Sequence, residues 1–346
     1  MDFQKDYLHW DRFLVEFPHA HILQCSAWGR IKEEFGWDVY HLVSSLWGTQ
    51  ILVRNLFPGI RFAYIPKGVV AERQHLDRWI ANQGSDEFNR SVVDQLSAFC
   101  ENKRIAFVKI EPDVLLDTLN GNNFCPMGFV SSVHAIQPLR TILIDINCDD
   151  AEILARMKQK TRYNIRLAER KGVIVEESCD LDLFYQMMLA TGKRDRFGIH
   201  SKEYFSKVFR NFYELSQCAL FIAFFHDAPI AGLMVFSQGE RAFYFYGAST
   251  DQHREVMAPY LLQWRAIQWA KAKGCKVYDM WGVPDYDETT LESQFEIRKG
   301  GLWGVYRFKR GFGGQVVRYA GAYDLVISPL LYTLYRLFIK GSRNSQ

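Results

Sequence analysis

Two stretches of this 346-residue chain share one order of predicted elements, and this repetition constrains the fold more than any other feature of the sequence. Each stretch contains three short runs of strand-forming residues, then a helical segment, then a fourth strand with a proline near its exit. The first stretch covers about 39–112 and the second about 219–284. A copied supersecondary unit explains the shared order, although two β-rich patterns can also coincide. Strands followed by helices favour an α+β fold.

The chain is long enough for two domains, and we expect one for each stretch. We place the domains at 1–150 and 151–346, packed side by side with a ligand-binding cleft between or beside them. The predicted strands are 39–45, 50–57, 60–65 and 105–110, followed by 219–226, 228–238, 241–248 and 276–281. The predicted helices are 86–103, 181–191, 202–215 and 259–273, with a largely helical start over 1–37.

A strongly basic segment lies between the two stretches. Residues 156–171 contain seven Lys or Arg and a single acid, Glu169. With Asp149 or Asp150 as a cap at its start and Gly172 at its end, the segment predicts one helix over about 151–171. Cations four residues apart repel one another on a helix, so this run indicates an anionic partner such as a polyphosphate. A basic face that only meets solvent is the alternative.

Composition limits the other function classes. The net charge of +3 does not by itself indicate a nucleic-acid binder, so the local excess of cations matters more. The seven cysteines are scattered without a CxxC pair, which argues for reduced thiols in a cytoplasmic protein and against a disulfide framework or structural zinc. No signal pattern, long apolar run, GxSxG or HExxH motif stands out, and we expect no metal.

The repeated order of elements is also found in acyltransferases that use acetyl-CoA. In that fold a glycine-containing turn at the start of the helix holds the pyrophosphate with backbone amides. The corresponding stretch here is 252–260, where Arg254 is present, Met257 stands in a glycine position and Pro259 has no amide proton. Coenzyme A is therefore disfavoured, and we expect a different acyl donor.

Four segments resemble the Fem family of non-ribosomal peptidoglycan aminoacyltransferases. They are HILQCSAWGRIKEEFGW (21–37), KTRYNIRLAERKGV (160–173), FYFYGAS (243–249) and GLWGVYRFKRGFGG (301–314). The four segments are distributed along nearly the whole chain and occur in the same order as in the family. The resemblance implies two acetyltransferase-like (GNAT-type) domains and no cofactor. It also implies that an aminoacyl-tRNA ester gives its amino acid to the stem-peptide side-chain amine of a peptidoglycan precursor, either UDP-MurNAc-pentapeptide or lipid II.

Longer members of the family insert a helical-hairpin arm after the basic segment, whereas here Gly172 leads directly into a predicted strand. The short form is more similar to the branch that uses a soluble, nucleotide-linked acceptor. The resemblance implies a cytoplasmic monomer, with peripheral contact at the inner membrane surface as an option. Two alternatives stay open: a CoA-dependent N-acyltransferase of the same fold and a non-catalytic RNA-binding protein.

The resemblance implies two residues for the chemistry. Lys309 matches the family's lysine near the transfer site, where an ammonium could stabilise the oxyanion of a tetrahedral intermediate. The aromatic–basic alternation around it predicts a strand with Arg307 and Lys309 on one face, and an exposed edge lysine is the alternative. Glu111 is the candidate that guides the proton of the incoming amine. The family more often has aspartate there, and a turn carboxylate before Pro112 is the alternative.

The same resemblance assigns four residues to the acceptor. Lys32 matches the family's lysine for the acceptor phosphates, and its partner is Arg194 or Arg196, of which we prefer Arg194. Tyr246 and Phe308 are expected to contact the stem peptide. A surface charge cluster is the alternative for Lys32, and a place in the core is the alternative for Tyr246.

The basic segment is assigned to the acceptor arm of the tRNA, through phosphate contacts that weaken as salt rises. The residues of this set are Lys158, Lys160, Arg162, Arg166, Arg170 and Lys171. The tail over 323–340 is apolar and aromatic, contains Arg336 and Lys340, and is interrupted by Pro329. We expect the tail to pack on the second domain, and contact with a membrane surface is the alternative.

Overall fold

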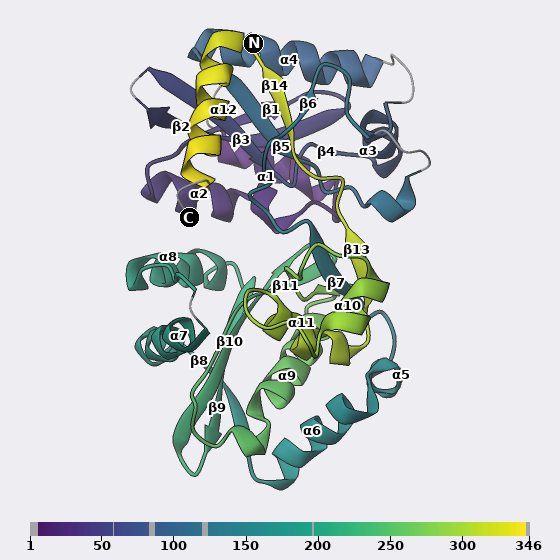
Figure 1. The fold of residues 1–346 in the computed structure, drawn as a ribbon, viewed down its shortest axis with the longest axis vertical. Coiled ribbons are helices and arrows are strands. Elements are labelled where there is room, and N and C mark those ends of the chain that lie inside the picture. The colour runs from purple at the N-terminus through teal and green to yellow at the C-terminus, as the bar shows by residue number, and fades with distance from the viewer. Residues whose placement is uncertain (1–5, 58, 83–86, 120–123, 196, 344–346) are drawn as a thin grey trace. The chain divides into compact units, whose positions relative to one another are not determined.

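The structure, a computed structural model, describes residues 6–57, 59–82, 87–119, 124–195 and 197–343. It divides into two compact units, each built around a seven-stranded sheet (Figure 1). Unit 1 comprises Met1–Leu139 and Arg318–Gln346, and unit 2 comprises Arg140–Val317. The predicted α+β class is confirmed.

The boundaries of these units differ from the expected domains 1–150 and 151–346. Unit 2 begins earlier because β7 (Arg140–Asp145) pairs antiparallel with β12 (Val277–Asp279). The end of the chain returns to unit 1, where β14 (Tyr323–Val326) pairs antiparallel with β5 (Phe107–Glu111). Both differences come from strand pairing between segments far apart in sequence, which local patterns do not reveal.

The sheet of unit 1 has the strand order β1-β2-β3-β5-β14-β6, with β4 paired to β2. Its remaining strands are β1 (Asp38–Val43), β2 (Trp47–Phe57), β3 (Ile60–Pro66), β4 (Val70–Ala71) and β6 (Val130–Ser131). β3 and β5 are parallel, and β1, β2 and β3 form the predicted antiparallel meander. The short helices α1 (Tyr7–Val15), η1 (Ile22–Gln24) and α2 (Ser26–Glu34) precede the sheet.

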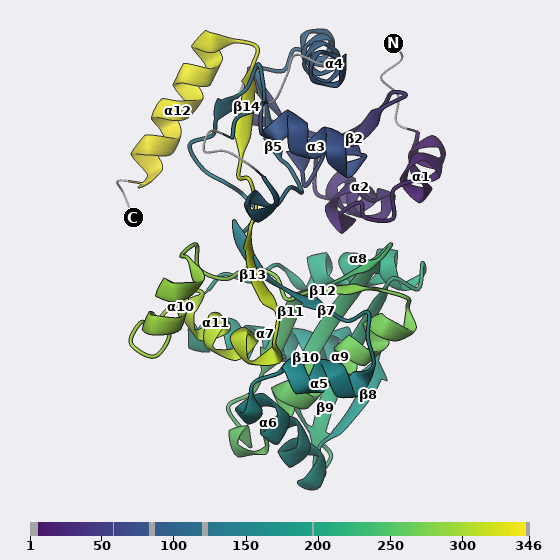
Figure 2. The same ribbon diagram turned by 90° about the vertical axis from the view of Figure 1, so that its right-hand side faces the viewer.

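Helices cover both faces of the unit 1 sheet. Alternate residues of β2 enter opposite cores: Ile51 and Val53 pack with α3 (Arg73–Ile80) and α4 (Glu87–Lys103), whereas Leu52 packs with α12 (Pro329–Arg343). Figure 2 shows α12 on the opposite side of the sheet from α3. The expectation that the tail packs on the second domain is therefore wrong. Pro329 starts α12, where a missing amide proton is tolerated.

The sheet of unit 2 has the strand order β13-β7-β12-β11-β10-β9-β8. Its other strands are β8 (Ile174–Ser178), β9 (Cys218–Phe225), β10 (Ala228–Gln238), β11 (Arg241–Ser249) and β13 (Gln315–Arg318). On one face pack α5 (Asp150–Arg156), α6 (Gln159–Arg170), α9 (Ala258–Ala272) and α11 (Trp303–Lys309). Helices α7 (Leu181–Asp195) and α8 (Lys202–Tyr213) cover the other face, where Phe212 meets Phe236 of β10.

The two sheets repeat one topology, as the sequence predicts. In unit 1 the order β1-β2-β3-β5-β14 contains one parallel pair, β3 with β5. In unit 2 the order β9-β10-β11-β12-β7 contains the corresponding parallel pair, β11 with β12. The connecting helices, α3 and α4 in one unit and α9 in the other, lie at the same place in the chain order.

The basic segment forms two helices where the sequence predicts one. Asp149 caps α5 by accepting from the amide of Glu152 at 2.7 Å, which confirms the expected cap. The helix stops at Met157, whose side chain is buried in the core, and Lys158 donates its amide to the carbonyl of Gly311 at 2.9 Å. α6 then runs from Gln159 to Arg170. The amide of Lys158 therefore donates to a distant residue, Gly311, and not to the carbonyl four residues earlier, as it would in a continuous helix.

All seven cysteines carry free thiols. Within the described ranges no helix is long and apolar enough to cross a membrane.

Candidate functional site

Lys309 ends the short helix α11 and does not lie on a strand. Trp303, Tyr306 and Lys309 follow one another at a spacing of three, and all three are buried. The expected strand, with Arg307 and Lys309 on one face, is therefore wrong: Arg307 is exposed and Lys309 points inward. Aromatic and basic residues alternate here with the period of two that is typical of a strand. The buried residues, however, are three positions apart, as in a helix.

The ammonium of Lys309 is held by backbone carbonyls in the interior of unit 2. The residue is 4% exposed, and Nζ donates to the carbonyl oxygens of Trp281 at 3.1 Å and Gly282 at 3.0 Å. The Tyr244 ring centroid lies 5.5 Å from Nζ. Burial lowers the pKa of Lys309 to about 7, and the charge of Asp279 offsets only part of this effect. Both ammonium and amine are therefore present near neutral pH.

These contacts lie where two parallel strands separate. The pairing of β11 with β12 runs from Arg241↔Val277 to Phe243↔Asp279, and β11 then continues to Ser249. We call this point the strand fork. Beyond a fork, the edge of the longer strand offers backbone donors and acceptors to an extended ligand. Lys309 binds the carbonyls that directly follow β12, so its charge is fixed at the fork.

A β-bulge decides which tyrosine of β11 faces Lys309. Val235 is paired with Tyr244 and Met234 with Tyr246, so β11 has one extra residue between them. Tyr244 therefore joins the core that contains α11, whereas Tyr246 packs against Phe205 of α8 at 5.0 Å. The assignment of Tyr246 to the stem peptide stays a prediction, and Tyr244 is the tyrosine near Lys309.

Phe308 packs beside Lys309 in an aromatic cluster. Its ring centroid lies 5.1 Å from that of Tyr260 on α9 and 5.1 Å from that of Phe312. The side chain is half-buried, so part of it can still meet a ligand. Its contact with the stem peptide also stays a prediction.

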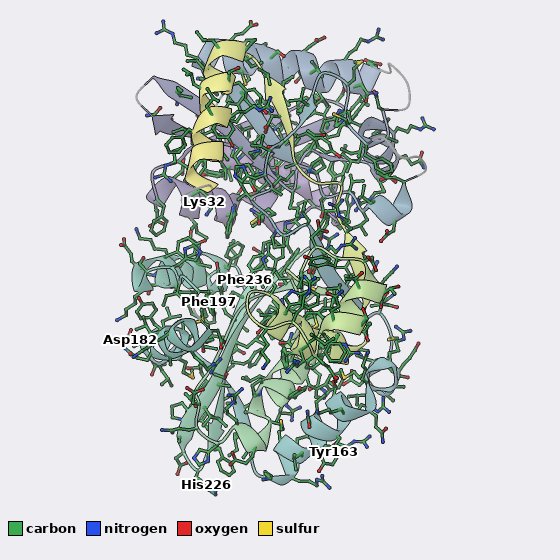
Figure 3. The ribbon with its side chains drawn as sticks, viewed as in Figure 1. Lys32, Tyr163, Asp182, Phe197, His226 and Phe236 are labelled. Atoms are coloured by element: carbon green, nitrogen blue, oxygen red, sulfur yellow. The ribbon has the colours of Figure 1, made fainter. Side chains whose placement is uncertain are left out.

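The cations of the basic segment have different surroundings. Lys158 pairs with Glu292 at 2.9 Å, and Arg162 donates to main-chain carbonyls at the end of α5, including that of Ala155 at 3.2 Å. Four others are exposed and, within the described part of the chain, have no carboxylate in ion-pair range. They are Lys160, Arg166, Arg170 and Lys171. The Arg170 guanidinium lies 5.8 Å from the ring of Tyr163, which Figure 3 labels on α6.

These four cations, together with Lys158 and Arg162, form what we call the basic surface. Arg162 is partly occupied as a cap for α5, so the stripe expected from Lys158 to Arg170 is shorter than predicted. The only acid of the segment, Glu169, lies 3.7 Å from Arg265 of α9. Among the described residues, the four exposed cations that have no carboxylate in ion-pair range are suited to contacts with a phosphate chain.

The basic surface and Lys309 are joined through a glycine-rich segment. The carbonyl of Gly311 accepts the amide of Lys158, and a Cβ on Gly311 would collide with the Thr161 side chain. Gly313 has φ +80 and touches the backbone of Arg156. A larger residue at Gly311 would push α6 away from the segment after α11, and one at Gly313 would collide with the end of α5, so the close approach depends on both glycines.

Glu292 of α10 (Glu288–Gln294) holds the same junction from outside. Its carboxylate accepts from Lys158 Nζ at 2.9 Å, from Arg310 Nε at 2.6 Å and from the Tyr306 hydroxyl at 2.6 Å. Arg310 is the main reason why the pKa of Glu292 falls to about 2. Nothing in the sequence pattern singles out Glu292 from the acids around it, because its partners Lys158, Tyr306 and Arg310 lie elsewhere in the chain.

Arg194 of α7 is already neutralised by acids. It pairs with Asp195 at 2.9 Å and Asp251 at 3.3 Å, and donates to the carbonyl of Ser249 at 2.8 Å. These contacts fix the end of β11. A phosphate would have to compete with both carboxylates, which weakens the expectation that Arg194 binds the acceptor. The other candidate, Arg196, lies outside the described residues.

Lys32 belongs to unit 1, where it stands on α2 (Figure 3). Its Nζ lies 4.4 Å from the centroid of the Trp28 ring, four residues earlier on the same helix face. Burial lowers the pKa of Lys32 to about 8. Glu33 accepts from the Tyr7 hydroxyl at 2.8 Å. Lys32 is thus a half-buried cation held against an aromatic ring, a setting that suits an anionic ligand group.

Glu111 ends β5 and is occupied by the surrounding chain. It accepts from the Tyr64 hydroxyl at 2.5 Å, from the amide of Gln137 at 3.1 Å and from the amide of Ile136. Burial raises the pKa of Glu111. Because three donors of the surrounding chain already occupy this carboxylate, the geometry favours the turn carboxylate over the catalytic one.

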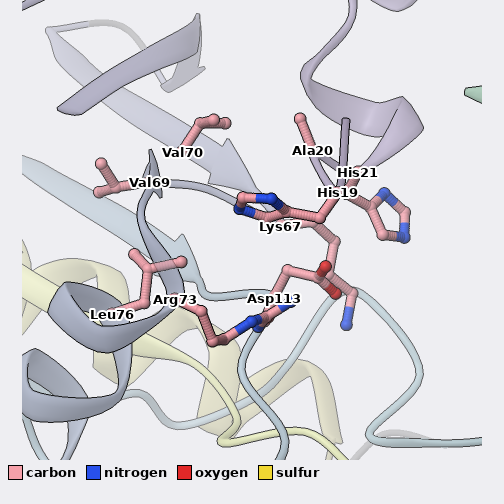
Figure 4. Close-up of a pocket in the computed structure, with 9 residues that line it drawn as sticks. All are labelled: His19, Ala20, His21, Lys67, Val69, Val70, Arg73, Leu76 and Asp113. Carbon is pink, nitrogen blue, oxygen red and sulfur yellow. The ribbon is translucent and has the colours of Figure 1, made fainter. Parts of the chain in front are cut away.

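Unit 1 contains a hollow that Lys67 helps to line. Figure 4 shows Lys67, Arg73 and Asp113 among its lining, with Arg73 donating to the carbonyl of Asp113 at 2.6 Å. Lys67 is buried, and its Nζ lies 2.8 Å from the centroid of the Tyr319 ring. Lys67 also lines a second hollow, together with Glu111. Lys67 is a single lysine after a strand, and no sequence pattern distinguishes it.

The turn that would hold the pyrophosphate of coenzyme A uses its amides internally. The amides of Val256 and Met257 donate to His253 and Arg254 at 3.0 and 3.3 Å. Met257 has φ +59 and begins α9 in a glycine-like conformation. These two amides are therefore not available to a pyrophosphate.

A model of the FemAB family matches residues 127–226 and 223–340, which is more than half of the chain. The chain belongs to the FemAB family. Lipid II:glycine glycyltransferases of Staphylococcus haemolyticus and Staphylococcus epidermidis are 22% and 21% identical to it, over 94% of this chain and 92% of theirs. The alignment with the Staphylococcus haemolyticus enzyme extends over 411 positions, more than the 346 residues of this chain. That relative therefore has segments that this chain lacks.

Solved structures give the fold of this FemAB chain. The crystal structure of FemX has a TM-score of 0.81 at 19% identity, covering 96% of this chain and 99% of FemX. L-PGS from Bacillus licheniformis has a TM-score of 0.54 at 13% identity and covers 97% of this chain and 98% of its own. A tandem GNAT protein has a TM-score of 0.50 at 9% identity, over 85% and 84%. The predicted GNAT-like architecture is confirmed.

Proposed function

We propose that this FemAB protein transfers the amino acid of an aminoacyl-tRNA to the stem-peptide side-chain amine of a peptidoglycan precursor. Family membership and the relatives named lipid II:glycine glycyltransferase support a transferase that acts on such precursors. The tRNA donor and the identity of the accepting amine are proposed from the site. UDP-MurNAc-pentapeptide and lipid II are the two candidate acceptors.

One observation carries the proposal. In unit 2 the basic surface and the buried ammonium of Lys309 share one rigid junction, made by the Lys158 amide on Gly311 and by Glu292. A tRNA acceptor arm bound by phosphate contacts ends in a single-stranded terminus with the ester. The proposal therefore assigns an RNA anchor and a charge for the ester carbonyl to the same unit, an arrangement that a CoA-dependent enzyme does not need.

The chemistry needs positioning and charge more than a nucleophile. The donor is an activated ester, so the acceptor amine can attack its carbonyl directly; a C–N bond forms, the C–O bond to the tRNA ribose breaks, and the amine proton leaves to the ribose oxygen or to solvent. We assign Lys309, in its ammonium form, to the oxyanion of the intermediate. The free edge of β11 would align the aminoacyl group at the strand fork.

Unit 1 supplies groups for the acceptor. Lys32, half-buried against Trp28, is assigned to the acceptor diphosphate, which a charge-assisted bond stabilises by about 1.5–3 kcal/mol. Glu111 is assigned to positioning, because its three donors fix the loop at Ile136 and Gln137. A cytoplasmic monomer is the state that we propose, and the free thiols are compatible with that compartment.

The test is a transfer assay with isotope-labelled amino acids on a panel of charged tRNAs. Each is offered with UDP-MurNAc-pentapeptide or with lipid II in detergent, and label is counted in the acceptor. Label should move to an acceptor from at least one tRNA, and Lys309→Ala should stop this movement while RNA binding persists. Transfer from acetyl-CoA alone, or no transfer from any charged tRNA, would contradict the proposal.

A further inference from the structure

The C-terminal helix α12 has two apolar sides, and the described residues of unit 1 bury the large side chains of one of them. On the inner side, Tyr332 and Tyr335 are buried, and their ring centroids lie 5.2 and 4.6 Å from that of Phe107 in β5. Figure 2 shows α12 as an outer layer of unit 1. The inner contacts explain why the helix folds against the sheet, but they leave its other side without a function.

The outer side presents four large apolar side chains to solvent. Leu330, Leu334, Leu337 and Phe338 are 73%, 49%, 62% and 52% exposed. Their spacing of four, three and one residues places them on one face of the helix. We call this the α12 outer face. Single exposed leucines are ordinary, whereas four on one helix face indicate a surface that is covered in use.

The charged residues of this segment have one sign. From Pro329 to Gln346 the chain contains Arg336, Lys340 and Arg343 and no Asp or Glu. Arg336 is exposed and lies between the inner and outer sides, by its position in the helix repeat. An apolar helix face bordered by cations is the pattern of helices that lie in the surface of an anionic bilayer, where the apolar side chains enter the acyl boundary and the cations meet headgroup phosphates.

We propose that the α12 outer face docks unit 1 on an anionic lipid surface. A second copy of the chain fits less well, because a symmetric contact through this face would bring the cations of both helices together with no acid on either to offset them. The inference stands apart from the transfer reaction, since lipid binding is measured without donor or acceptor.

The experiment measures co-sedimentation of the full chain with vesicles of equimolar phosphatidylcholine and phosphatidylglycerol, and with phosphatidylcholine alone. Leu334→Ser with Leu337→Ser removes apolar area from the exposed face and leaves the inner tyrosines in place. Arg336→Gln with Lys340→Gln removes charge. The matched control is Leu8→Ser with Val15→Ser on α1, which removes two apolar side chains of 74% and 81% exposure from the same unit.

We expect binding to the anionic vesicles and weak binding to the neutral ones. The leucine pair should lower the partition coefficient about tenfold or more, and the charge pair should lower it by roughly fivefold for each cation removed. The α1 pair should bind like the wild type. Circular dichroism and thermal melting of each variant establish that unit 1 remains folded.

Three results would overturn the inference. One is the absence of binding to anionic vesicles. Another is binding that the leucine pair leaves intact, which would assign it to the basic surface of α6. The last is a concentration-dependent dimer that the leucine pair abolishes, which would identify a second copy as the occupant.

Discussion

Replacing Lys309 with methionine removes an ammonium that the fold keeps away from water. Methionine has a similar length and no charge, so it can fill the same space. The wild-type side chain is 4% exposed, and its burial lowers the pKa from 10.5 to about 7. A pKa difference of that size means that folding weakens the binding of the Lys309 proton by about 5 kcal/mol.

The sign of the pH effect follows from where the proton is bound. The unfolded chain keeps the Lys309 proton up to about pH 10, whereas the folded protein releases it near pH 7. Between these values the unfolded state binds more protons, so this group makes the free energy of unfolding of the wild type rise with pH. Methionine has no such contribution. From about pH 6 to about pH 9 the wild type should therefore gain about 2–3 kcal/mol relative to Lys309→Met.

Urea denaturation of both proteins at the two pH values measures this difference, because every other titrating group is common to them. Lys202→Met, at a lysine side chain that is 51% exposed, serves as the control and should follow the wild type at both pH values. Parallel pH dependence of the wild type and Lys309→Met would mean that Lys309 titrates normally. The assignment of a buried, carbonyl-bound ammonium at the strand fork would then be refuted.

Three further predictions concern the basic surface, Glu292 and Glu111. Lys160→Gln with Arg166→Gln should reduce the slope of log affinity for RNA against log salt by about one unit per lost contact. The control variant Arg210→Gln on α8 should not change this slope. An unaltered slope in the double variant would exclude α6 from the RNA surface. Glu292→Gln should lower the free energy of unfolding at neutral pH by about 1 kcal/mol, allowing for solvent screening. That deficit should vanish as the pH falls from 4.5 towards about 2, where the Glu292 carboxylate takes up its proton; a deficit that persists at low pH would contradict the ion-pair account. Glu111→Gln should lower stability by roughly 2–3 kcal/mol in thermal melts, because an amide cannot satisfy all three donors, and a variant as stable as the wild type would show that the carboxylate does not hold the loop.

Local sequence patterns predicted the repeated unit because its strands and helices have clear periods. The strand predicted at 228–238 is β10 (Ala228–Gln238), and the predicted helix at 86–103 is α4 (Glu87–Lys103). The parallel pairs β3–β5 and β11–β12 follow from the shared order. β10 is an almost continuous buried apolar run, and α4 buries Phe88, Val92, Leu96 and Phe99 at helical spacing, so both patterns extend over enough positions to be recognised.

The errors come from contacts between distant segments. Aromatic and basic residues alternate around Lys309, yet burial of Trp303 and Tyr306 at helical spacing makes α11. The bulge in β11 that directs Tyr244 towards Lys309 depends on its pairing with β10 and has no sequence mark. Acids far along the chain decide which cations are free, as Glu292 does for Lys158. Residue type was enough to indicate the candidate site residues. Their contacts depend on packing between segments that are distant in the sequence.

The most direct test of the central claim is tandem mass spectrometry of the acceptor after incubation with the protein and a charged tRNA. We predict an acceptor heavier by one aminoacyl residue, joined by an amide bond to the side-chain amine of the stem peptide. An acceptor of unchanged mass with every charged tRNA, or one whose added group lies elsewhere than on that amine, would contradict the account.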